Sequence, residues 1–325
     1  MTDESDGVAV VFKGAGWLFP FYFGVAQYMK DNYDISSDNF RAGGVSAGSV
    51  TALLLLSDAN FNSILEDILS EYDTMKYNPF LIKDCLDRIL NKYVSGVKPL
   101  LNVNRRLIVG VASLQRYWWC RGLRDWLKGH VITSFLSVSS YIDALHASCY
   151  MPVISGLLPY YVDGHGFYDG ELANIKWKKE CEDVGFSVTN IVYVAVSEMD
   201  NFSNDDVELK VSITPGVVFP NIWRYYPIDP FVLRQVFRLG YLRAKEKLDN
   251  LTWNEMFEMQ KIYDIIRFCM RTSHVTTYNR VWRTVAAWIL SPKWLFIVGI
   301  LVFRKGLFRK VQYHITRMFK DILVV

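Results

Sequence analysis

Residues 41–50 read Arg-Ala-Gly-Gly-Val-Ser-Ala-Gly-Ser-Val, which places Ser46 between Gly44 and Gly48 in a G-x-S-x-G pattern. The residues before Ser46 are typical of a short strand, and the apolar run at 50–56 is typical of a helix. A serine on such a strand–turn–helix corner holds its hydroxyl above the sheet, and small flanking residues allow the tight turn. The pattern predicts Ser46 as a nucleophile, although an ordinary Gly-rich turn has the same appearance.

Strand-like and helix-like segments alternate along the rest of the chain. Short apolar runs typical of buried parallel strands occupy residues 8–12, 40–45 and 191–196. Helical spacing of apolar residues marks 17–29, 60–77, 79–93, 141–150 and 231–250. Two short strands, 159–162 and 166–168, flank a turn at Asp163-Gly164-His165. The alternation predicts an α/β fold with a mainly parallel central sheet.

Composition suggests a protein that faces the cytosol and contacts lipid. The 325 residues are 51% apolar and 15% aromatic, which is high for a freely soluble protein. The five cysteines are odd in number and form no C-x-x-C, which favours a reducing compartment. The N-terminus is acidic and runs directly into the first strand, so we expect no signal peptide.

The charge is distributed unevenly. The chain carries +3 in total, yet residues 280–325 hold nine Lys or Arg and one acid, so this segment is +8 and the remainder −5. Because the basic residues are interleaved with apolar runs, a lipid surface suits them better than nucleic acid. Pro292 and Lys293 interrupt residues 285–303, which argues against a clean membrane span.

We therefore expect a globular domain over residues 1–250 and a helical region over 251–325. The basic, apolar tail at 281–325 is expected to contact a membrane or lipid droplet on its cytoplasmic side. A true span and a buried pair of helices remain alternatives for this tail.

An acyl-transfer serine also needs hydrogen-bond donors for an oxyanion. Gly14, Ala15 and Gly16 follow the first strand and precede a helix, where backbone N–H groups approach a substrate oxygen closely. A dinucleotide fingerprint would place its third glycine where this chain has Phe19. The stretch therefore predicts an oxyanion loop rather than a nucleotide site.

The base that accepts the serine proton is less clear from spacing. None of the histidines lies in a recognisable triad setting, although His165 is the best candidate among them. The five histidines are His130, His146, His165, His274 and His314. Asp169, followed by Gly170, is an alternative, because a partly desolvated carboxylate accepts a serine proton directly. On spacing alone, Asp163 before Gly164 competes equally.

Together these segments resemble the patatin-like phospholipase domain, in particular its adipose-triglyceride-lipase-like branch. The resemblance rests on residues 12–18 with Tyr22, Gly24 and Val25, and on the serine motif at 44–48. It extends through 147–153, 156–159 and 168–170, with weaker similarity at 237–242, and so covers residues 8 to about 250. It implies a three-layer α/β sandwich that uses neither a metal nor another cofactor.

By position, the resemblance implies a Ser–Asp dyad with Ser46 as nucleophile and Asp169, not Asp163, as base. The oxyanion loop would be Gly14 to Gly16, and the substrates would be acyl esters of glycerol in phospholipids or neutral glycerides. Two residues depart from the family pattern, since Phe19 and Glu171 stand where glycine or alanine is usual.

A second carboxylate two residues from Asp169 could raise its pKa or crowd the serine. From the resemblance, the expected function is a lipid acyl hydrolase that forms an acyl-enzyme. An acyltransferase, a catalytically impaired lipid-binding protein and a nucleotide-binding enzyme remain alternatives.

Overall fold

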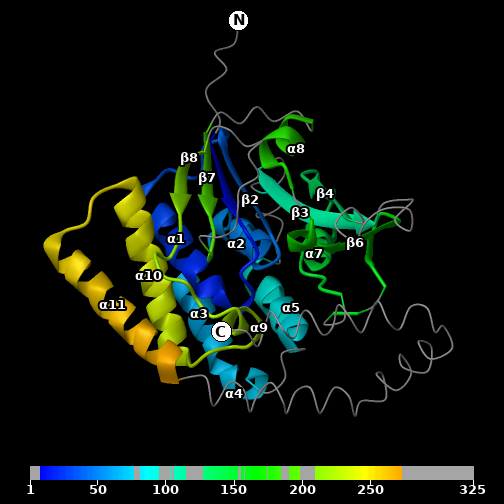
Figure 1. The fold of residues 1–325 in the computed structure, drawn as a ribbon. Coiled ribbons are helices and arrows are strands. Elements are labelled where there is room, and N and C mark those ends of the chain that lie inside the picture. Colours follow the sequence, from blue (N-terminus) through cyan, green and yellow to red (C-terminus); the bar gives the residue numbers. More distant parts are fainter. Residues whose placement is uncertain are drawn as a thin grey trace, which may run out of the picture.

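A single mixed sheet organises the described part of the chain. The computed structural model describes residues 8–76, 81–94, 103, 106–114, 127–152, 155–156, 158–173, 175–183, 190–197 and 209–272. These residues form an eight-stranded sheet with helices on both faces (Figure 1). The strands are β1 (Val8–Phe12), β2 (Phe40–Val45), β3 (Leu107–Leu114), β4 (Leu127–Ile132), β5 (Tyr160–Val162), β6 (His165–Asp169), β7 (Asn190–Val194) and β8 (Leu209–Ile213). The predicted α/β fold with a mostly parallel sheet is confirmed.

The strand pairings divide the sheet into a parallel and an antiparallel part. β1 pairs with β2 on one side and β7 on the other, and β2–β3 and β7–β8 continue the parallel ladder. β3 then pairs antiparallel with β4 and β6, and β6 forms a hairpin with β5. The hairpin turn holds Asp163 and Gly164 at positive φ angles of 50° and 77°, as tight two-residue hairpins require.

Alternating side chains of β1 belong to two different hydrophobic clusters, one on each face of the sheet. Val10 and Phe12 lie in the larger cluster with the helices α1, α2 and α3, whereas Ala9 and Val11 pack with Trp177 of α8. α10 packs on α1, and α11 lies beside α10 at the edge of the molecule opposite α8 (Figure 1). The helices are α1 (Phe19–Asn32), α2 (Ala47–Leu55), α3 (Phe61–Ser70), α4 (Tyr72–Met75), α5 (Ile82–Tyr93), α7 (Val138–Ser148), α8 (Trp177–Asp183), α9 (Ile222–Tyr225), α10 (Pro230–Leu248) and α11 (Trp253–Thr272), with short 3-10 turns η1 (Gly16–Leu18) and η5 (Gly170–Leu172).

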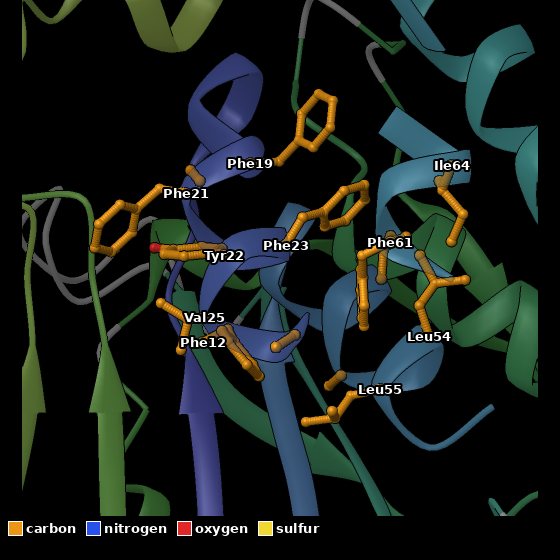
Figure 2. Close-up of a cluster of buried hydrophobic side chains, with 14 of the residues drawn as sticks. Phe12, Phe19, Phe21, Tyr22, Phe23, Val25, Leu54, Leu55, Phe61 and Ile64 are labelled. Carbon is orange, nitrogen blue, oxygen red and sulfur yellow. The ribbon is translucent and has the colours of Figure 1, made fainter. Parts of the chain in front are cut away.

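Helix α1 is buried along most of its length. Its residues 19–29 are all buried, as expected for a helix that is apolar on every side. Figure 2 shows Phe23 between the rings of Phe19 and Phe61, whose centroids lie 4.9 and 5.1 Å from its own. α10 crosses α1 in backbone contact, because a Cβ atom on Gly240 would lie only 2.0 Å from the carbonyl oxygen of Phe21.

Several element boundaries differ from those expected. The predicted helix at 60–77 is divided into α3 and α4 at Glu71, and the predicted helix at 17–29 begins as the 3-10 turn η1. Strands β3, β4 and β8 were not predicted from the sequence. β4 begins at residue 127, directly after a segment that lies outside the described residues.

The C-terminal tail lies outside the part of the chain that the structure describes, which ends at residue 272. The expected membrane contact of 281–325 therefore stays a prediction. Within the described ranges, the helices are too short or too polar to cross a bilayer.

Candidate active site

Ser46 stands at a sharp corner between β2 and α2. Its φ and ψ angles are 53° and −132°, a backbone conformation that is strained for a residue with a side chain. The corner leaves no space for neighbouring side chains. A Cβ atom on Gly44 would lie 2.5 Å from the carbonyl carbon of Gly48, and one on Gly48 would lie 2.3 Å from the Phe12 carbonyl oxygen. Positions 44 and 48 therefore need glycine for steric reasons. The ends of β1 and β2 contact the start of α2 through backbone atoms.

The register of β3 brings Asp169 to this corner. Val45, which precedes Ser46, is paired with Gly110, and the next residue of β3, Val111, is paired with Asp169. The Asp169 carboxyl group lies close enough to the Ser46 side chain for that side chain to lower its pKa. By contrast, Asp163 is exposed on the β5–β6 turn. The structure therefore brings Ser46 together with Asp169 rather than with Asp163.

Burial changes the acidity of Asp169. Its side chain is 1% exposed, and the loss of water raises its pKa to about 7. The negative charge of Glu171 raises the pKa further, as expected from the sequence, while the hydrogen bond from the Glu171 backbone N–H (2.9 Å) and the nearby Ser46 side chain oppose the rise. A carboxyl group with a pKa near neutrality can both accept and return a proton at physiological pH.

Ser148, at the end of α7, ties the serine corner to β3. Its Oγ accepts a hydrogen bond from the Ser46 backbone N–H at 2.9 Å and donates one to the Gly110 carbonyl oxygen at 2.7 Å. The next residue, Cys149, lies beside Ser46, and burial raises the pKa of its thiol. Gly170 packs against the same strand, since a Cβ there would lie 2.5 Å from the Gly110 carbonyl oxygen. Neither Ser148 nor Cys149 was singled out as a site residue by the sequence.

The predicted oxyanion loop lies directly beside this corner. Gly14 and Ala15 are buried, and Gly16 adopts a φ of 53° and borders the same cavity as Ser46. The loop leads through η1 into α1, so it lies at the positive end of a helix. The backbone N–H of Gly14 donates a hydrogen bond to the Glu171 carboxylate, with a nitrogen–Oε2 distance of 2.9 Å.

An apolar cavity of about 140 Å³ opens beside Ser46. Phe19 is part of its wall. The other large apolar residues that line it are Trp17, Phe23, Val50, Ile68, Leu86 and Ile89. A hydrocarbon chain is the ligand that such a lining suits best.

A histidine borders the cavity, but it is His146 and not His165, which the sequence favoured. His146 of α7 lines it, and the His146 Nε2 lies 2.8 Å from the Asp87 Oδ1 of α5. His165 is exposed on the hairpin turn with its Nδ1 3.0 Å from the Asp163 carbonyl oxygen, and His130 contacts Ser113. His274 and His314 lie outside the described residues. The His146–Asp87 pair joins residues distant in the chain, so no local motif could have identified it.

The raised pKa of Asp169 makes this side chain costly for stability at high pH. Below about pH 4 the carboxyl group is protonated in both the folded and the unfolded chain, whereas between pH 4 and about 7 only the unfolded chain releases the proton. The free energy of unfolding should therefore decrease as the pH rises through this interval. We expect Asp169→Asn to raise the Tm by roughly 2–8 °C at pH 8, and by less at pH 4, as measured by thermal unfolding at both values.

Asp163→Asn is the matched control, because this aspartate is exposed and asparagine tolerates the same positive φ. Its Tm should follow that of the wild type at both pH values. An equal effect of Asp169→Asn at pH 4 and pH 8 would contradict a buried ionisable carboxylate.

Comparison with known proteins is consistent with this geometry. A model of the family described as patatin-like phospholipase matches residues 10–175, just over half of the chain, and the matched region includes Gly14, Ser46 and Asp169. No match was found among curated proteins. The extent of the family match shows that this chain belongs to the patatin-like phospholipase family.

Proposed function

We propose that the protein hydrolyses acyl esters of glycerolipids with Ser46 as nucleophile and Asp169 as base. The family is one of lipid acyl hydrolases, which gives ester hydrolysis as the activity at the family level. The observation that carries the finer assignment is the position of the buried Asp169 next to Ser46, which itself borders an apolar cavity.

In the proposed acylation step, the Ser46 Oγ attacks the ester carbonyl carbon while Asp169 accepts the hydroxyl proton. Backbone N–H groups of the Gly14–Gly16 loop stabilise the oxyanion of the tetrahedral intermediate. As the intermediate collapses, the carbon–oxygen bond of the ester breaks and Asp169 returns the proton to the departing alcohol. An acyl-enzyme on Ser46 remains.

Deacylation repeats the sequence with water as the nucleophile. Asp169 takes a proton from the water, the hydroxide attacks the acyl-enzyme, and the fatty acid leaves as Ser46 recovers its proton. The pKa of Asp169 near 7 suits both directions of transfer. If a lipid hydroxyl replaced the water, the same intermediate would give acyl transfer.

The cavity supports an acyl chain as the part of the substrate that is bound. Its wall is formed by aromatic and aliphatic side chains from α1, α2, α3 and α5. The resemblance to the adipose-triglyceride-lipase-like branch favours a neutral glyceride, whereas the family description favours a phospholipid. Release of fatty acid from purified lipids of each class distinguishes the two.

The dyad is tested with a fluorophosphonate probe and an ester hydrolysis assay on the full chain. We expect the probe to label the wild type and Ser46→Ala to abolish labelling, because the probe reacts with an activated serine. Asp169→Asn should lower hydrolysis by roughly a hundredfold or more, the usual contribution of a general base.

Two variants serve as controls for that experiment. Ser63→Ala removes an exposed serine of α3, and Asp163→Asn removes the competing carboxylate. Both should keep the wild-type rate. Loss of activity in Asp163→Asn with a normal rate in Asp169→Asn would show that the base is misassigned, and an unlabelled folded wild type would rule out the hydrolase.

Phe19 is expected to restrict the acyl chains that the cavity accepts. Its ring lies in the cavity wall and packs on Phe23. Phe19→Ala should therefore raise kcat/KM for long or unsaturated acyl esters relative to short ones by roughly tenfold, as measured on a chain-length series. Phe21→Ala, in the same helix but absent from the cavity lining, is the control. An unchanged chain-length profile would show that acyl chains do not occupy this cavity.

We propose in addition that the tail at 281–325 holds the domain on a membrane or lipid-droplet surface. Its basic residues alternate with apolar runs, and each basic residue near an anionic surface contributes about 1 kcal/mol. Replacing Arg304, Lys305, Arg309 and Lys310 by Gln should lower sedimentation with anionic liposomes at least about tenfold. Removing four positive charges elsewhere, at Lys178, Lys179, Lys247 and Lys261, is the control. Equal binding of both variants would contradict the tail's role.

A further inference from the structure

Glu171, in the 3-10 turn η5 after β6, contacts the loop after β1. Its Oε2 lies 2.9 Å from the Gly14 backbone nitrogen, although the two residues are 157 positions apart in the chain. A Cβ atom on Gly14 would lie only 2.8 Å from the same oxygen. The carboxylate thus lies directly against the Gly14 amide.

The position of Gly14 gives this contact a consequence for the proposed reaction. The carbonyl oxygens of Phe12 and Lys13 would lie 2.3 and 2.5 Å from a Cβ on Gly48, so the Gly14 loop touches the Ser46 corner. In the proposed function, this loop donates hydrogen bonds to the oxyanion. An N–H that already donates to a carboxylate is not available for that oxyanion, and two negative oxygens at one donor repel each other.

We propose that Glu171 occupies an oxyanion donor in the resting enzyme and that the reacting substrate must displace it. This inference rests on the proposed function. The Glu171 carboxylate takes the place of the oxyanion at the Gly14 N–H and lowers the turnover rate until it moves away. Because Glu171 is an exposed residue, its side chain has space to turn into solvent. Glu171 therefore acts through Gly14, without bonding to the reacting atoms.

The side chain and the backbone of Glu171 have separable roles. Its backbone N–H donates to Asp169 Oδ1 at 2.9 Å, and by this bond the Asp169 side chain caps the 3-10 turn η5. Substitution of the side chain leaves that hydrogen bond in place. Glu171→Ala removes the carboxylate entirely, while Glu171→Gln keeps a neutral oxygen of the same reach, which accepts a weaker hydrogen bond.

The experiment measures kcat and KM for ester hydrolysis, and the rate of Ser46 labelling by a fluorophosphonate, in wild type, Glu171→Gln and Glu171→Ala. We expect Glu171→Ala to be roughly three- to tenfold faster than wild type and Glu171→Gln to lie between them. The increase should appear in kcat rather than KM, because the oxyanion exists only in the transition state and the intermediate. Glu182→Gln, an exposed glutamate of α8, is the matched control.

The opposite order of rates would overturn the proposal. A structural tie between Glu171 and Gly14 predicts that wild type is fastest and Glu171→Ala slowest, with a lower Tm for that variant. If Glu171→Ala does not fold, Glu171→Gln alone decides, since a rate equal to or below that of wild type contradicts displacement. Failure of the proposed function is distinguishable, because labelling would then be absent from wild type or unaffected by Ser46→Ala.

Discussion

The direct backbone contact between β1, β2 and α2 is the constraint on which the site depends. A side chain at Gly44 or Gly48 would overlap backbone atoms of these elements, so the corner closes only with glycine at both positions. This closeness holds Ser46 at a φ of 53°, a strain that the surrounding core supports. α1 is buried over residues 19–29 and packs on α2, within the apolar cluster that Figure 2 shows. The proposed nucleophile and the proposed oxyanion loop thus lie on segments that contact each other through backbone atoms.

The chemistry of Asp169 follows from its burial at the same place. Withdrawal from water gives the carboxyl group a pKa suited to proton transfer, and it also makes the ionised form unfavourable for folding. Proteins commonly carry such a cost at functional sites. Glu171 adds a second carboxylate to the site, with its backbone N–H bound to Asp169 and its side chain bound to Gly14. Glu171 therefore links the proposed base to the proposed oxyanion loop in this chain.

The local elements were largely predictable from the sequence. β1, β2, β7, the β5–β6 turn and helix α10 depend on short runs of apolar residues and on turn-forming residues, which act over a few positions. The central strand β3 was missed, although Leu107-Ile108-Val109-Gly110-Val111 is a continuous apolar run. The division of 60–77 into α3 and α4 was missed because apolar spacing continues across the break. Ser148, His146 and Asp87 have no local motif, since their partners lie far along the chain.

The sequence by itself determined the serine corner, the glycine turn at 14–16 and the α/β class, because glycine spacing and apolar periodicity act locally. It left Asp163 and Asp169 as equals on spacing, and only the resemblance separated them. In the tertiary structure the two aspartates differ in position. β6 runs antiparallel beside β3, which buries Asp169 next to Ser46 and leaves Asp163 exposed on the turn. The contact of Glu171 with Gly14 was likewise decided only by folding, since it joins two segments 157 residues apart whose meeting depends on the order of the strands.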